Sequence, residues 1–205
     1  MAAKTLELTD STIFNNGCHK KVYTHPENPQ LCIKIPYNAE GQDDLDRELF
    51  IRRRLQRNNI STKILPKYFG TTETTLGKGY IFELIKDFDG NISLTLDDYL
   101  KDENLFKKHY EKLLENILFL KKRLFEEKLV IMGMWPENVI IQRLNADTLR
   151  AVLVNDLGSA ALIPLEYYFE FLNKKRTQRR WQRFLGNIAS RYSYPQAKIF
   201  LEKIK

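Results

Sequence analysis

The stretch LVIMGMWPENVII, residues 129–141, and the stretch NDLG, residues 155–158, decide the interpretation of this chain. Each joins an apolar, strand-like run to one polar residue: Asn138 precedes the run VII, and Asp156 follows the run AVLV. If the two runs form a hairpin, the side-chain oxygens of Asn138 and Asp156 approach each other. Carboxylate and amide oxygens are suitable ligands for one Mg²⁺. The alternative is that both are ordinary turn residues.

The composition indicates a folded cytosolic protein. The chain has 205 residues, of which 43% are hydrophobic, enough for a packed core. Neither Cys18 nor Cys32 lies in a C-x-x-C pair, and the three histidines lack metal-ligand spacing. The N-terminus has no apolar run typical of a secretory signal, and no apolar run is long enough to span a membrane. We therefore expect a cytoplasmic location.

The net charge of +7 is concentrated near the C-terminus, where residues 164–205 carry ten Lys and Arg against three Glu. Most of these cations lie in the stretch NKKRTQRRWQRF: Lys174, Lys175, Arg176, Arg179, Arg180 and Arg183. This stretch is either a solvated basic face or a site for an anionic partner, such as a phosphorylated saccharide or an anionic membrane surface. Nucleic-acid binding is disfavoured because no base-reading motif appears.

Residues 1–86 predict a small antiparallel sheet with one helix. The pattern indicates a strand pair over residues 12–25, a strand over residues 30–37 and a helix over residues 43–55. Two further strands follow, joined by a turn that contains Gly77 and Gly79.

Residues 87–205 predict a helical part that contains one short hairpin. A long helix over residues 105–129 has an apolar face, expected to point inward: Leu113, Leu114, Ile117, Leu118, Leu120 and Leu124. Residues 138–156 read as two strands around the turn NAD. In the final helical region, Trp181, Phe184, Leu185 and Ile188 recur at helical spacing and are expected in the core. The whole is an α+β fold with a division near residues 85–91.

Four residues of the N-terminal part suggest phosphate binding. Lys34 lies within a short apolar strand, where a charged side chain needs a partner, and Glu48 on the following helix is suitably placed to be that partner. Gly17 lies in the polar turn before that strand, and Lys20 could add positive charge there. Taken alone, each has an ordinary interpretation as a turn glycine, an edge-strand lysine or a surface charge.

The order Lys34, Glu48, PEN and DLG resembles the protein-kinase-like superfamily. More narrowly, HKKVYTHPENPQLCIKI, FGTTETTLGKGYIFELIKDFDGNISLTL, MWPENVI and LVNDLGSAALIPL resemble the YrbL proteins of the PhoP regulatory network in Gram-negative bacteria. The resemblance covers roughly residues 8–185. It implies a two-lobed kinase-like fold with a minimal helical lobe.

The resemblance also implies roles for individual residues in binding ATP with Mg²⁺. Lys34 would contact the nucleotide phosphates and Glu48 would hold Lys34. Asn138 and Asp156 would bind the metal. The backbone of residues 83–85, which includes Glu83 and Ile85, would meet the adenine.

This sequence departs from the kinase pattern at the catalytic loop. The motif H-R-D-L-K-P-E-N maps onto residues 131–138, so Gly133 stands where the catalytic Asp is expected and Trp135 replaces the Lys. No A-P-E motif follows Asp156. Losing a general base typically costs about 10²–10⁴-fold in rate.

Three functions are therefore compatible with the sequence. The first is a phosphotransferase that acts on a small-molecule or envelope saccharide hydroxyl. The second is a pseudokinase, a catalytically inactive regulatory or protein-binding module. The third is a kinase-like fold that binds no nucleotide, suggested by the loss of two glycines from the loop around Gly17.

Overall fold

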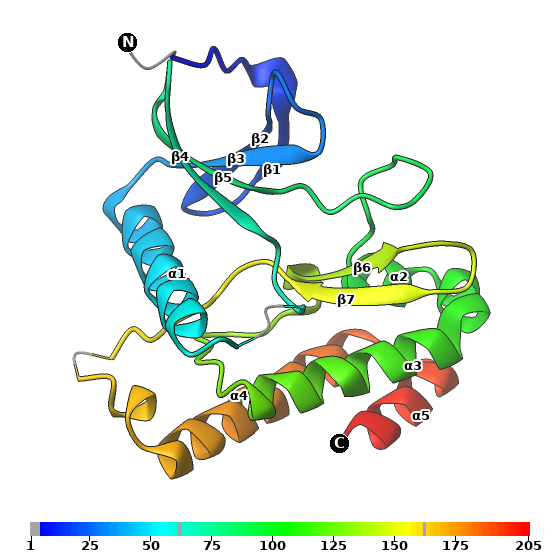
Figure 1. Ribbon diagram of the computed structural model, residues 1–205. Coiled ribbons are helices and arrows are strands. Elements are labelled where there is room, and N and C mark those ends of the chain that lie inside the picture. Colours follow the sequence, from blue (N-terminus) through cyan, green and yellow to red (C-terminus); the bar gives the residue numbers. More distant parts are fainter. Residues whose placement is uncertain (1–4, 61–62, 162) are drawn as a thin grey trace.

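The computed structural model describes residues 5–60, 63–161 and 163–205. It is a mixed α+β fold with an antiparallel sheet near the N-terminus and most helices near the C-terminus (Figure 1). The first four residues of the expected N-terminal part lie outside the described residues. Among the helices of the described chain, none is long and apolar enough to cross a membrane.

The N-terminal part is a five-stranded sheet in the order β1-β2-β3-β5-β4, with every neighbouring pair antiparallel. The strands are β1 (Ile13–Asn16), β2 (Lys20–Thr24), β3 (Leu31–Pro36), β4 (Tyr68–Thr74) and β5 (Gly77–Glu83). A short 3₁₀ turn, η1 (Asp10–Thr12), precedes them. The expected β4–β5 turn was misplaced, because Gly77 and Gly79 lie within β5 and pair with β4.

Helix α1 (Ala39–Arg57) joins β3 to β4 along the chain and packs between the sheet and the helical part (Figure 1). It begins earlier than predicted, where Asn38 caps it by accepting a hydrogen bond from the amide of Gly41. Its buried residues recur at helical spacing: Gly41, Leu45, Glu48, Ile51 and Leu55. Leu45 packs with the sheet, whereas Ile51 and Leu55 belong to the core of the helical part.

The C-terminal part has four helices and one hairpin in the described chain: α2 (Leu96–Lys101), α3 (Glu103–Glu126), α4 (Glu170–Arg191), α5 (Pro195–Ile204), and strands β6 (Val139–Arg143) and β7 (Leu149–Leu153). Short 3₁₀ turns lie at η2 (Pro136–Asn138) and η3 (Leu165–Tyr167). The predicted hairpin is confirmed by the register from Val139–Leu153 to Arg143–Leu149.

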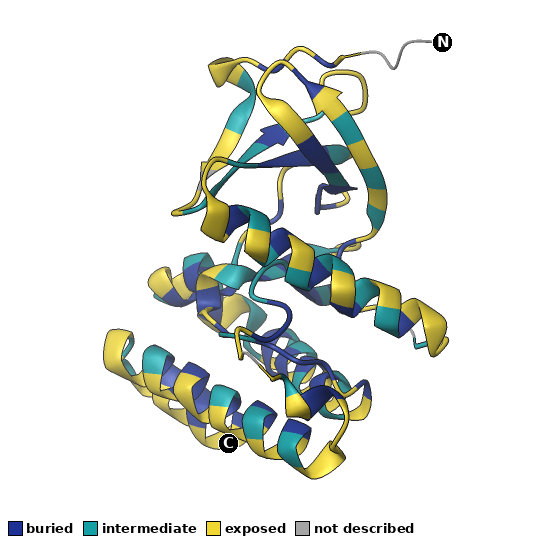
Figure 2. Ribbon diagram, turned by 90° about the vertical axis from the view of Figure 1, so that its left-hand side faces the viewer, coloured by how far each residue is buried: buried dark blue, intermediate teal, exposed yellow. Residues whose placement is uncertain are grey.

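Most apolar residues of the C-terminal part lie in one core between α3, α4, α5 and the hairpin. Figure 2 shows these helices with buried residues along one side and exposed residues along the other. Trp181, Phe184, Leu185 and Ile188 are buried as predicted. The prediction for Leu118 was wrong: it is 39% exposed, because it lies off the buried stripe of α3.

Candidate functional site

The site lies where the sheet, α1 and the end of the β6–β7 hairpin meet. Strand β3 supplies Lys34 and α1 supplies Glu48. The 3₁₀ turn before β6 supplies Asn138, and the segment after β7 supplies Asp156. Residues that are more than a hundred positions apart in sequence thus converge on one place.

Lys34 is a buried cation whose hydrogen-bonding capacity is met by protein groups. Its Nζ atom lies 3.3 Å from Glu48 Oε2, 2.9 Å from the carbonyl oxygen of Val154 and 3.3 Å from Asn155 Oδ1. It also lies 4.4 Å from the ring centroid of Phe82. Burial lowers the pKa of Lys34, and Glu48 opposes that shift. The expected pairing of Lys34 with Glu48 is therefore confirmed.

Glu48 is held by two cations. Besides Lys34, Arg52 on the next turn of α1 donates from Nε and Nη2 to Glu48 Oε1 at 3.0 and 2.7 Å. Burial alone would raise the pKa of Glu48, but Lys34 and Arg52 together hold that pKa below its ordinary value. Arg52 Nη1 also donates to the carbonyl of Pro66 at 2.6 Å. We call Lys34, Glu48 and Arg52 the lysine cluster.

Asn138 and Asp156 come together as the sequence predicted, but the amide nitrogen of Asn138, rather than its oxygen, faces the carboxylate. Asn138 Nδ2 donates to Asp156 Oδ2 at 2.9 Å, and Asn138 Oδ1 accepts from Asn155 Nδ2 at 3.3 Å. Asp156 has φ +62°, in the left-handed region that costs a non-glycine residue energy. Asp and Asn adopt this conformation more readily than other non-glycine residues.

Two backbone contacts fix Asp156 against the preceding loop. The amide of Met132 donates to the carbonyl of Asp156 at 2.7 Å, and the amide of Gly158 donates to the carbonyl of Val130 at 2.8 Å. Gly158 has φ +102°, and a Cβ there would lie 2.7 Å from Cβ of Arg47. Only glycine allows this segment to pass so close to α1.

Burial raises the pKa of Asp156, against the lowering effects of Lys20 and of the hydrogen bond from Asn138. Lys20 is itself paired with Asp44 of α1 at 3.0 Å, and Asp44 also accepts from Arg47 at 2.9 Å. Gly17 forms a tight turn here, because its amide donates to the carbonyl of Lys20 at 3.0 Å. We call Gly133, Asn138 and Asp156 the aspartate cluster.

Gly133 lies directly beside Asp156. A Cβ at Gly133 would lie 3.2 Å from Asp156 Oδ2 and 3.1 Å from Trp135 Nε1. Two acids of the same region, Glu137 and Asp147, are not free to act as a base there. Glu137 pairs with Arg191, and Asp147 pairs with Lys112 at 2.9 Å at the opposite end of the hairpin.

A small cavity of about 80 Å³ adjoins the lysine cluster between the sheet and the hairpin. Its walls include Val22, Phe82 and Ile140, and its rim includes the segment 83–85. The amide of Ile85 donates to no backbone group among the described residues, and the carbonyl of Glu83 lies 3.8 Å from Cys32 Sγ.

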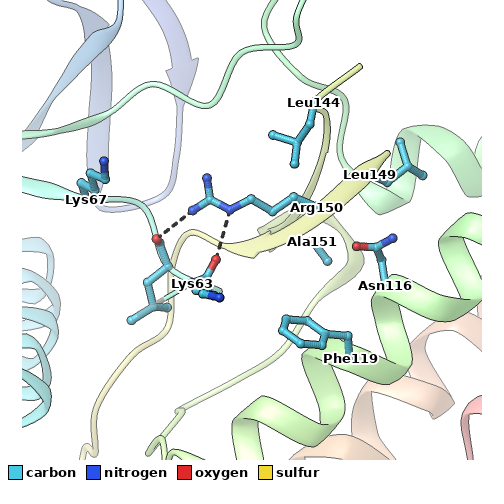
Figure 3. Close-up of a pocket in the computed structure, with 9 residues that line it drawn as sticks. Lys63, Lys67, Asn116, Phe119, Leu144, Leu149, Arg150 and Ala151 are labelled. Atoms are coloured by element: carbon cyan, nitrogen blue, oxygen red, sulfur yellow. Dashed lines mark hydrogen bonds between the residues drawn. The ribbon is translucent and has the colours of Figure 1, made fainter. Parts of the chain in front are cut away.

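A larger cavity of about 470 Å³ lies elsewhere, between the hairpin and α3 (Figure 3). Arg150 lies in its centre and donates to the backbone carbonyls of Lys63 and Leu65 at 3.1 and 3.4 Å. None of the residues expected to handle phosphate or metal lines this cavity, so it is not part of the candidate site.

The chain matches the family model described as PhoP regulatory network protein YrbL over residues 6–189. It belongs to the YrbL family. The "Uncharacterized protein YrbL" of Escherichia coli (strain K12) is 31% identical over 186 residues, which cover 90% of this chain and 88% of that protein. The protein of the same description from Shigella flexneri gives the same values. The family description connects its members with the PhoP regulatory network and states no reaction.

Several contacts at the site of this YrbL family member were not foreseen from the sequence. Arg52, Asn155 and Asp44 all bind the expected site residues. Arg52 could have been found, because it lies four residues after Glu48 on the same helix face. Asn155 and Asp44 gave no comparable signal, because their partners lie on other elements.

Proposed function

We propose that this YrbL family member has a two-lobed protein-kinase-like fold and binds ATP with Mg²⁺ between its sheet and its hairpin. The observation that carries this proposal is the convergence of Lys34, Glu48, Asn138 and Asp156 from four separate elements. A buried cation beside a strained carboxylate is what a triphosphate and its metal require.

The adenine ring would enter the small cavity between the sheet and the hairpin. The apolar side chains of Val22, Phe82 and Ile140 suit a flat aromatic ring. The carbonyl of Glu83 and the amide of Ile85 supply an acceptor and a donor for its polar edge. The cavity is smaller than the roughly 300 Å³ of typical ligand pockets, so binding widens the space between sheet and hairpin.

The donor set fits Mg²⁺ that arrives with a nucleotide. The described residues contain no group of three or more His, Cys, Asp or Glu side chains able to hold a metal ion. Asp156 and Asn138 supply one carboxylate and one amide oxygen, and Mg²⁺ commonly takes its other ligands from water and substrate phosphates. The metal would neutralise charge on the phosphates, whereas Lys34 would exchange one of its 3.3 Å contacts for a phosphate oxygen.

The reaction that this arrangement supports is transfer of the terminal phosphoryl group to a small-molecule or saccharide hydroxyl. The acceptor oxygen forms a bond to the γ-phosphorus, the bond from that phosphorus to the bridging oxygen breaks, ADP leaves, and the hydroxyl proton passes to solvent. The chain's residues contribute positioning and charge, which supply most of the catalysis in phosphoryl transfer.

Gly133 favours a second candidate, nucleotide binding without transfer. Neither Glu137 nor Asp147 replaces the missing base, because each is paired with a cation elsewhere. Trp135 and Asp156 border the position where a base would project. In this second candidate, the chain is a regulatory module whose state depends on bound ATP.

Calorimetric titration with ATP, with and without Mg²⁺, tests the binding proposal. Wild type should bind with Mg²⁺, and Lys34→Ala and Asp156→Asn should both lose that binding. Lys112→Ala, which removes an exposed ion pair far from the site, is the matched control and should bind as wild type does. If wild type binds ATP and forms ADP when a cell extract that contains candidate acceptors is added, transfer is favoured. Binding of ATP without formation of ADP favours the regulatory module. Metal-independent or undetectable binding in wild type would refute both.

A further inference from the structure

Arg180 is a half-buried cation that lacks a partner in the described chain. Its Nε atom is buried without a hydrogen bond, and its guanidinium forms no ion pair with any residue that the structure describes. Arg176, one turn earlier, differs: Nη1 lies 2.7 Å from Glu166 Oε1, and Nε donates to the carbonyl of Ile131 at 3.3 Å. A buried guanidinium Nε that donates no hydrogen bond is costly. It therefore suggests a ligand.

The contacts of α4 place Arg180 next to the loop that contains Gly133. Going along α4, Asn173 Nδ2 donates to the carbonyl of Lys128 at 3.0 Å, Arg176 reaches Ile131, and Arg191 pairs with Glu137. The helix thus runs beside residues 128–137 in the same direction, and Arg180 falls between the contacts to Ile131 and Glu137.

The charge environment agrees with this position. Burial and the neighbouring cations Arg176, Arg183 and Arg179 lower the pKa of the Arg180 guanidinium, whereas Asp156 opposes that change. Asp156 is therefore within electrostatic range of Arg180. Lys175, Arg179 and Arg183 are exposed on the same helix and add to the positive potential.

We propose that Arg180 binds a phosphate monoester group on the second ligand of this site, the molecule that would accept or sense the phosphoryl group. Guanidinium binds such groups with paired, charge-assisted hydrogen bonds. This inference rests on the proposed function, because it assigns the second ligand of the same site.

Titration with inorganic phosphate and phosphate monoesters in the absence of nucleotide and metal tests the assignment. The soluble probes are inorganic phosphate and a hexose 6-phosphate, followed by two-dimensional NMR. The membrane probe is phosphatidylcholine vesicles with and without phosphatidic acid. Arg180→Ala should weaken binding of whichever probe wild type binds by about tenfold or more, as expected for loss of a charge-assisted contact. Arg180→Gln, which retains most of the side-chain volume, should show the same loss if Arg180→Ala folds poorly.

Arg179→Ala is the matched control, because it removes the same charge from the neighbouring exposed position. It should keep binding within about threefold of wild type, as expected for an exposed charge. If Arg180→Ala loses binding of the soluble probes alone, the ligand is a small molecule. If it loses binding of the phosphatidic acid vesicles alone, the ligand is a lipid headgroup. Equal loss in Arg179→Ala and Arg180→Ala, or binding of neither class of probe, would overturn the assignment.

The affinity for ATP with Mg²⁺ separates this inference from the proposed function. Arg180→Ala should leave that affinity within about twofold of wild type, since the contact is with the second ligand. A large loss of ATP affinity with unchanged phosphate monoester binding would assign Arg180 to the nucleotide instead. Failure of the monoester titration alone leaves the nucleotide proposal intact.

Discussion

The lysine cluster and the aspartate cluster lie side by side but differ in how their charges are satisfied. In the lysine cluster, Glu48 balances Lys34 and Arg52 at 2.7–3.3 Å, and all three side chains have protein partners. In the aspartate cluster, Asp156 is a strained, partly buried carboxylate whose only side-chain hydrogen bond in the described chain comes from Asn138. The side chains of the first cluster balance one another, whereas the carboxylate of the second has no cation paired with it in the described chain.

The largest effect should come from removing the centre of the lysine cluster. Glu48→Ala leaves Lys34 and Arg52 buried without their anion, which should lower the free energy of unfolding by about 3–5 kcal/mol. Urea denaturation measures this change. A loss below about 1 kcal/mol would mean that Glu48 does not hold the two cations in solution.

A carboxylate added to the aspartate cluster should also be destabilising. Gly133→Asp places a Cβ 3.2 Å from Asp156 Oδ2 and 3.1 Å from Trp135 Nε1. The crowding should cost about 1–3 kcal/mol, and repulsion between the two carboxylates adds to it. Gly133→Ala is the control for crowding without charge. If Gly133→Asp is as stable as wild type and releases ADP faster, the loop retains room for a base.

The link between the turn at Gly17 and α1 should matter less. Lys20→Ala removes the ion pair with Asp44, whose two side chains are 14% and 18% exposed. The expected loss is about 1 kcal/mol or less, as for most ion pairs near the surface. Thermal unfolding measures it. A loss above about 2 kcal/mol would show that this pair is part of the structural core.

Asp156→Asn should have the smallest effect on stability. It should leave stability unchanged or raise it slightly, whereas the other substitutions lower it. Burial raises the pKa of Asp156 in the folded chain, so the ionised carboxylate costs stability near neutral pH. An amide at this position can still accept the hydrogen bond from Asn138. The ligand-free variant should therefore unfold at the same or a slightly higher temperature than wild type.

The pH dependence provides the check on this sign. As pH falls through the raised pKa of Asp156, wild type gains a proton in the folded state and loses the cost of the buried charge. The difference in the free energy of unfolding between Asp156→Asn and wild type should therefore shrink as the pH falls toward about 4, the ordinary carboxyl pKa. Glu48 behaves oppositely, because its pKa is lowered: its contribution is present above the unfolded pKa and is lost as pH falls through the folded pKa. A difference that widens on acidification would contradict the assignment for Asp156.

Much of this arrangement could be predicted from sequence because its signals are local. The short apolar run around Lys34, the run after Asn138 and the run before Asp156 predicted the strands that bring these residues together. Leu118 and the turn at Gly77 and Gly79 were misplaced, because a helix face and a hairpin turn depend on neighbours that a short pattern does not specify. The partners of Asp44 and Asn155 depend on how separate elements pack.

Paramagnetic broadening by Mn²⁺ with ATP tests the central claim most directly. Mn²⁺ takes the same oxygen ligands as Mg²⁺, and it broadens the NMR signals of nearby amides. We expect Mn²⁺ and ATP together to broaden the amide signals of Asn138 and Asp156, Mn²⁺ alone to broaden them much less, and Asp156→Asn to abolish the effect. Broadening located elsewhere, or equal in Asp156→Asn and wild type, would contradict the assignment of these residues to a metal–nucleotide site.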